Sequence, residues 1–250
     1  RVAVAVSGGV DSMTLAHAVH GQLGNDATMF HAISPAVAPE ATERVRQHAE
    51  SSGWALRVID AGEFSDQDYL RNPANRCYFC KSNLYSAIRS QCQGLMLSGT
   101  NLDDLQDYRP GLRAADVFGV RHPYVEQRID KAMVRQIAKS FGLNELSDIP
   151  ASPCLSSRLE TGIPVDPEKL SLVHAMEQCV SQAFPTGTVR CRVRRAGLVM
   201  ELDEDLYRKL PAERNGAVRK ELEHIGQAHG YNGNIEYAIY RMGSAFLHDQ

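Results

Sequence analysis

The chain has 250 residues, of which 43% are hydrophobic, and its formal net charge is −3. This length and hydrophobic content suffice to bury a core, which excludes a disordered protein. Neither a long basic run nor an apolar stretch near the roughly 18 residues of a membrane span is present. The first residues read as a strand and not as a charged and apolar leader. We therefore expect a soluble, cytoplasmic protein with no nucleic-acid or membrane partner.

Apolar strands and helices alternate along residues 1–148. Short apolar runs predict buried strands at 2–6, 28–33, 56–59 and 95–97. Helical spacing and end signals predict helices at 13–20, 39–52 and 81–91, and a fourth from an Asp130 cap to Gly142. Residues 121–125 read as a further strand. The alternation predicts an α/β domain with a doubly wound parallel sheet, whose ligands bind at the carboxyl ends of the strands.

The order of elements changes after a loop rich in Pro, Ser and Gly at residues 148–167, and we place the domain boundary between residues 148 and 149. Beyond the loop we expect helices at 167–180 and 212–228 and strands at 188–193, 198–202 and 235–240. This pattern predicts a smaller α+β domain over residues 149–250. Its strand edges suit substrate binding and assembly into a homo-oligomer.

The string SGGVDS lies between the first strand and the first helix, where backbone N–H groups and the positive helix end hold anions. We call residues 7–12 the phosphate loop. Gly8 and Gly9 let the backbone approach phosphates closely, and Ser7 and Ser12 add hydroxyl donors. Asp11 beside a phosphate makes sense as a magnesium ligand or as a helix cap. The GKS or GKT ending of a Walker loop is absent, which argues against a mononucleotide kinase or GTPase.

The hexapeptide resembles the signature of the PP-loop pyrophosphatase superfamily, which has a HUP-like fold. In that superfamily the loop holds the pyrophosphate end of ATP while AMP is transferred to a substrate oxygen. The resemblance implies an adenylating enzyme that uses ATP and Mg²⁺. It assigns the nucleotide to Ser7, Gly8, Gly9, Val10, Asp11, Ser12 and Gly99.

Six cysteines in a cytoplasmic chain are more typical of thiols, metal ligands or catalytic groups than of disulfides. Cys77 and Cys80 form CYFC directly before an expected helix, where i,i+3 spacing puts both sulfurs on one side and favours thiolates. Cys154, at the domain junction, is a third candidate ligand. Three thiolates suit an iron–sulfur cluster with one open position, whereas a zinc clip or unligated thiols remain the structural alternatives. The other three cysteines read as small buried residues.

Four motifs read together carry a closer resemblance. They are SGGVDS, GTNLDDLQDYRPGLRAA from Gly99, ASPCLSSR from Ala151 and TVRCRVR from Thr188. The set spans almost the entire chain and resembles the LarE family of ATP-dependent sulfur transferases, which act in nickel-pincer nucleotide synthesis. The resemblance implies a nicotinate-derived mononucleotide substrate whose carboxylate is adenylated and then attacked by sulfur.

Two sulfur sources are known in that family. In one branch a single cysteine, here Cys154, gives up its own sulfur and the enzyme is single-use. In the other branch three cysteines hold a 4Fe-4S cluster that delivers an extra sulfide. The presence of Cys77 and Cys80 makes this chain similar to the second branch, with Cys154 as both ligand and catalytic residue.

Charged residues in the matching segments complete the candidate site. Asp103 and Asp104 are expected to bind magnesium or orient the intermediate, or else to form a solvated acidic loop. The pairs Arg109 with Arg113 and Arg190 with Arg192 are expected to clamp a phosphate or carboxylate, or else to form a charged solvent face. Arg158, beside Cys154, is expected to lower the pKa of that thiol.

Three other functions compete with this interpretation. A tRNA thiolase of the same superfamily also uses three cysteines, but it needs a basic surface or an added RNA-binding module, which this chain lacks. A non-enzymatic ATP sensor would bind the nucleotide without turnover. A structural zinc protein with a vestigial loop would be distinguished by its metal content.

Overall fold

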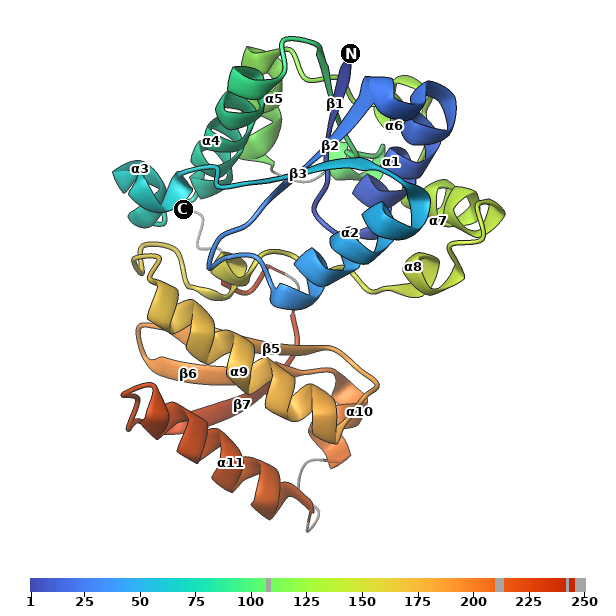
Figure 1. Cartoon of the computed structure of the whole chain (residues 1–250). Helices are drawn as coiled ribbons and strands as arrows, with labels where there is room; N and C mark the ends of the chain where they lie inside the picture. The colour runs from blue at the N-terminus through green and yellow to red at the C-terminus, as the bar shows by residue number, and fades with distance from the viewer. Residues whose placement is uncertain (107–108, 210–213, 242, 246–250) are drawn as a thin grey trace. The chain divides into compact units, whose positions relative to one another are not determined.

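The computed structural model describes residues 1–106, 109–209, 214–241 and 243–245 (Figure 1). The chain forms two compact units, one of residues 1–69 and 75–153 and one of residues 70–74 and 154–250. Asp107 and Tyr108 of the long motif lie outside the described residues, as do the first two residues of the helix expected at 212–228.

The first unit is built on a four-stranded sheet in the order β3-β2-β1-β4, with every neighbouring pair parallel. Its strands are β1 (Val2–Ala5), β2 (Ala27–Ala32), β3 (Ala55–Ile59) and β4 (Leu95–Ser98). All four were predicted from the apolar runs, and the α/β class with a parallel sheet is confirmed.

Helices cover both faces of this sheet (Figure 1). The helices in this part of the chain are α1 (Val10–Leu23), α2 (Pro39–Ser52), α3 (Gln67–Leu70), α4 (Arg76–Gln91), α5 (Pro110–Phe118), α6 (Pro123–Glu126), α7 (Lys131–Ser140) and α8 (Asn144–Asp148). Three 3-10 turns accompany them, η1 (Gly24–Asp26), η2 (Glu63–Ser65) and η3 (Asp103–Leu105).

Two separate apolar clusters form the core of the first unit. Val4 and Met29 contribute to a cluster that includes residues of α1, α2 and α7, whereas their neighbours Ala3 and Phe30 contribute to one that includes residues of α4 and α5. Successive side chains of a strand point to opposite faces, so the central strands β1 and β2 are buried on both sides, whereas β3 at the edge is partly exposed. This arrangement is the doubly wound architecture that the sequence predicted.

Two local predictions in the first unit were wrong. Residues 121–125 do not form a strand: Arg121 makes one isolated bridge to Leu97, and Pro123 starts the short helix α6. Proline lacks an N–H for a sheet ladder but is well suited to the first turn of a helix. The CYFC motif does not precede its helix, because α4 begins at Arg76 and contains both cysteines.

The second unit has a three-stranded mixed sheet. β5 (Val189–Arg194) pairs antiparallel with β6 (Gly197–Leu202), which pairs parallel with β7 (Ile235–Ile239). The helices are α9 (Pro167–Ala183), α10 (Glu204–Lys209) and α11 (Arg214–Ala228), with the 3-10 turn η4 (Leu155–Arg158) before them. α9 packs against β5, and α11 packs against α9 (Figure 1).

The segment 70–74 is tied to the second unit by its hydrogen bonds. The buried Asn72 side chain donates to the carbonyl groups of Glu160 (2.9 Å) and Ile163 (2.8 Å), and the Leu70 carbonyl accepts from Val165 N.

Among the described residues, no helix is both long and apolar enough to span a membrane.

Candidate functional site

The phosphate loop connects β1 to α1 and is closed by its two serines. Ser12 Oγ accepts a hydrogen bond from Ser7 N (3.0 Å), lies 3.1 Å from Ser7 Oγ and donates to the Gly9 carbonyl (3.2 Å). Gly9 is the N-cap of α1 and makes no side-chain cap. The loop therefore presents the N-terminus of a 14-residue helix, which favours anions.

Two glycines are required by close contacts around this loop. Gly8 has a φ of +84°, and an added Cβ would lie 2.7 Å from the Ala41 carbonyl oxygen. Gly99 follows β4, and its added Cβ would lie 2.8 Å from Ser12 N. The phosphate loop is thus packed between the start of α2 and the end of β4.

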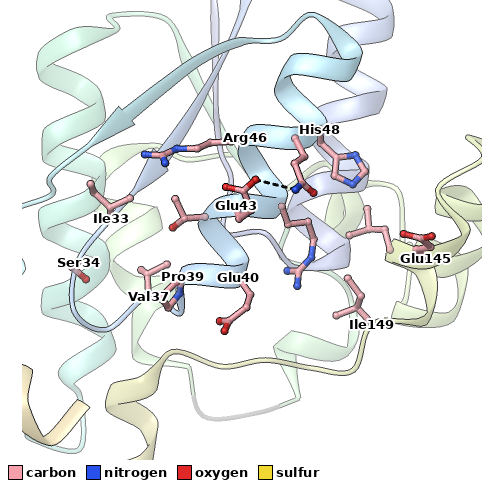
Figure 2. A pocket seen from close by; sticks show the side chains of 14 residues that line it. Ile33, Ser34, Val37, Pro39, Glu40, Glu43, Arg46, His48, Glu145 and Ile149 are labelled. Carbon is pink, nitrogen blue, oxygen red and sulfur yellow. Dashed lines mark hydrogen bonds between the residues drawn. The ribbon is translucent and has the colours of Figure 1, made fainter. Parts of the chain in front are cut away.

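Arg44 of α2 fixes the loop from one side. Its guanidinium donates to the Gly8 carbonyl (2.7 Å), and burial lowers the pKa of Arg44 although Glu40 opposes this. Arg44 also lines a cavity of about 780 Å³ around α2. Figure 2 shows this cavity, with Glu145 and Ile149 beside the helix. Arg44 therefore contacts the phosphate loop and also lines the cavity.

Asp11 accepts hydrogen bonds from three other segments of the first unit. Its carboxylate accepts from Asn101 Nδ2 (3.0 Å) and from Lys131 Nζ (2.5 Å). Its backbone carbonyl accepts from the Tyr124 hydroxyl (3.1 Å), and burial raises the pKa of Tyr124, which keeps that hydroxyl a donor. Since the cap position belongs to Gly9, Asp11 does not serve as the side-chain cap of α1.

The acidic loop after β4 is an ordered turn. Asn101 Oδ1 accepts from the N–H groups of Asp103 (3.0 Å) and Asp104 (3.3 Å). Asp104 accepts from Asn101 N and pairs with Arg109 (2.7 Å), and Asp103 accepts from Lys131 N (3.1 Å). The two acids therefore organise the loop that carries Asn101, and the predicted magnesium role of Asp103 stays a prediction.

The remaining candidates in the first unit lie around α4 and α5. Cys77 and Cys80 are partly exposed in the first turns of α4, and neither forms a disulfide. Arg113 is exposed with its guanidinium 5.8 Å from the centre of the Tyr78 ring. Within the described segments of the chain, no three His, Cys, Asp or Glu side chains are grouped to hold a metal ion, so the cluster stays a prediction.

In the second unit Cys154 is exposed and precedes η4, where the buried Arg158 holds its backbone. Arg158 Nη1 donates to the Cys154 carbonyl (3.1 Å), while Nε and Nη2 both donate to Glu177 at 2.9 Å. Burial disfavours the charge, but the hydrogen bonds and charge of Glu177 outweigh it and raise the pKa of Arg158. Arg158 is thus a paired cation that supports the cysteine loop.

The two arginines of β5 have different surroundings. Arg192 is buried, pairs with Glu201 (2.9 Å) and donates to the Ser157 carbonyl (3.0 Å). Arg190 is half-buried, and burial together with the nearby charge of Arg158 lowers its pKa. The substrate roles of both arginines stay predictions.

The structure adds four residues that the sequence did not single out. They are Arg44, Asn101, Tyr124 and Lys131, all of which contact the phosphate loop. Asn101 belongs to the motif GTNLDDLQDYRPGLRAA, but an Asn after a strand is also common in ordinary turns. Nothing in the residue order around Lys131 pairs it with Asp11, 120 positions earlier.

Known proteins resemble much of this chain, although no family model matches it. An uncharacterized protein of Synechocystis is 41% identical over 181 residues, 71% of this chain and 67% of that protein. An uncharacterized protein of Methanocaldococcus jannaschii is 25% identical over 224 residues, 88% of this chain and 84% of that protein.

A third relative, from Lactiplantibacillus plantarum, carries a functional name. It is pyridinium-3,5-bisthiocarboxylic acid mononucleotide synthase, 31% identical over 196 residues, 76% of this chain and 71% of that protein. This identity over most of both chains agrees with the four motifs and with the phosphate loop between β1 and α1. The chain belongs to the LarE family.

Proposed function

We propose that the protein is an ATP-dependent sulfur transferase of nickel-pincer nucleotide synthesis. It would transfer AMP from ATP to a carboxylate of a nicotinate-derived mononucleotide and release pyrophosphate. Sulfur would then attack the activated carbonyl, and AMP would leave to give a thiocarboxylate. The name of the L. plantarum relative, a bisthiocarboxylic acid mononucleotide synthase, supports this substrate class.

The observation that carries the proposal is the phosphate loop with Asp11 beside it. A helix N-terminus, two closely packed glycines and two serine hydroxyls suit the pyrophosphate end of ATP. The Asp11 carboxylate is 25% exposed and supplies the oxygen donors that Mg²⁺ prefers. Adenylation is chemically reasonable because a carboxylate oxygen leaves poorly and AMP leaves well.

The proposed sulfur chemistry centres on Cys154. Its thiol is exposed, and its backbone is fixed by an arginine whose charge is already paired with Glu177. Cys77 and Cys80 occupy successive turns at a helix start, a donor pair that suits an iron–sulfur centre. We propose that these two residues and Cys154 hold a 4Fe-4S cluster, which would supply the extra sulfide. Arg109, Arg113, Arg190 and Arg192 are the proposed substrate contacts.

The proposal is tested by measuring pyrophosphate release from ATP and Mg²⁺ with and without the dicarboxylate mononucleotide. Release that depends on this substrate is expected. Turnover of ATP with a transfer RNA instead would assign the chain to the thiolases, and nucleotide binding without any turnover would make it a sensor. Iron and acid-labile sulfide, measured after anaerobic purification, test the cluster: zinc in their place would indicate a structural clip.

We also propose a cytoplasmic location and a homo-oligomeric state. Thiolate chemistry of this kind requires a reducing compartment. β7 is an edge strand with an exposed Ile239, which suits pairing between copies. Sedimentation of the purified protein tests the assembly.

A further inference from the structure

The acidic residue of the phosphate loop already has a cationic partner. Lys131 Nζ lies 2.5 Å from Asp11 Oδ2, and the two side chains are 30% and 25% exposed. The pair is therefore within reach of a solute at the loop. Within the described parts of the chain, Lys131 is the ion-pair partner of Asp11.

The other oxygen of Asp11 is occupied by a neutral donor with a fixed orientation. Asn101 is 2% exposed, and its Oδ1 accepts two backbone N–H groups, which orients its amide. Nδ2 must then point toward Asp11 Oδ1, to which it donates at 3.0 Å. The neutralising charge at Asp11 thus comes from Lys131 and not from Asn101.

The backbone of Lys131 is fixed while its ammonium is carried on a flexible stem. Lys131 N donates to Asp103 Oδ2 (3.1 Å), and Asp130 caps the same helix by accepting from Met133 N (2.8 Å). In the part of the chain that the structure describes, the Lys131 ammonium pairs with Asp11, whereas Asp103 binds the Lys131 backbone N–H. A change of side-chain rotamer can therefore release Asp11 without moving α7.

These contacts place opposite charges where a polyphosphate would bind. An unpaired Asp11 carboxylate would repel the phosphates, and a magnesium ion would compete with Lys131 for the same oxygen. We propose that Lys131 neutralises Asp11 while no magnesium is bound, and that Mg²⁺ arriving with ATP replaces Lys131 at this carboxylate. Lys131 is thereby a positioning residue of the anion site, an assignment that rests on the proposed ATP-dependent function.

The test is equilibrium binding of an ATP analogue with a methylene bridge between its α and β phosphorus atoms, followed by calorimetry. Wild type, Lys131→Gln and Lys139→Gln are compared in EDTA and in Mg²⁺. Lys139 lies on the same helix with a 56% exposed side chain and serves as the control. In EDTA, Lys131→Gln should weaken binding at least about tenfold, or about 1.4 kcal/mol, and in Mg²⁺ by about threefold or less.

A double variant separates this role from direct phosphate contact. Asp11→Asn combined with Lys131→Gln restores the local charge balance, so its affinity in EDTA should return to within about threefold of wild type. Equal weakening of Lys131→Gln in both media, or a double variant as weak as Lys131→Gln, would overturn the inference. A wild-type protein that binds no analogue in either medium would instead overturn the proposed function itself.

Discussion

Gly8 and Gly9 are adjacent, but only Gly8 has a positive φ and a close backbone contact at the position of a Cβ. Substituting each by alanine therefore tests how the phosphate loop is packed. At Gly8 an alanine would have a φ of +84° and a Cβ 2.7 Å from the Ala41 carbonyl oxygen. The left-handed conformation alone costs an L residue about 1–2 kcal/mol, and the contact forces the loop or α2 to move. At Gly9 the added Cβ would meet Ser7 Oγ at 3.7 Å, an ordinary contact.

Gly8→Ala should therefore lower the free energy of unfolding by about 2 kcal/mol or more and reduce pyrophosphate release about 100-fold, since small displacements of binding groups are costly. Gly9→Ala should cost less than about 1 kcal/mol, because it changes only an N-cap residue. Urea unfolding and a pyrophosphate assay give both quantities. Equal losses of unfolding free energy from the two substitutions would refute the claim that the contact with Ala41 shapes the loop.

Three further predictions concern stability and sulfur transfer. Glu177→Ala should lower the free energy of unfolding by about 3 kcal/mol, because it removes the carboxylate that pairs with the buried Arg158 guanidinium. Glu204→Ala, in an exposed pair, should cost less than about 0.5 kcal/mol, and similar losses from the two substitutions would contradict the importance of burial. Burial, with smaller contributions from nearby histidines, lowers the pKa of His17 from 6.5 to about 4, so between these pH values the unfolded chain binds more protons than the folded chain. The free energy of unfolding should therefore fall as the pH is lowered from 6.5 toward 4, and His17→Gln should reduce this pH dependence in urea titrations. An unchanged pH dependence in the variant would contradict this role of His17. Cys154→Ala should stop thiocarboxylate formation but retain pyrophosphate release, and loss of both would indicate a folding role.

Local signals in the sequence were sufficient for most of the fold. The apolar runs predicted all four parallel strands, and the Gly53 end signal of α2 matches a left-handed residue with a φ of +67°. The helix at Pro110–Phe118 was not predicted, because a Pro-Gly start is more typical of a turn. Pro123 was assigned to a strand, although a proline lacks the N–H of a sheet ladder and favours the first turn of a helix.

The site was less accessible from the sequence than the fold. The phosphate loop has a local signature, but Arg44, Asn101 and Lys131 act through contacts with residues 36, 90 and 120 positions away. Arg192 illustrates the same limit: strand alternation placed it beside Arg190, yet its surroundings depend on Glu201 of the next strand. Residue type and spacing do not encode such partners.

The central claim is that ATP activates a carboxylate of a pyridinium mononucleotide for sulfur transfer. The most direct measurement is mass spectrometry of that nucleotide after anaerobic incubation with the protein, ATP and Mg²⁺. The account predicts exchange of one oxygen for one sulfur, with AMP and pyrophosphate formed in equal amounts. An unchanged nucleotide in the presence of intact, ATP-binding protein would contradict it.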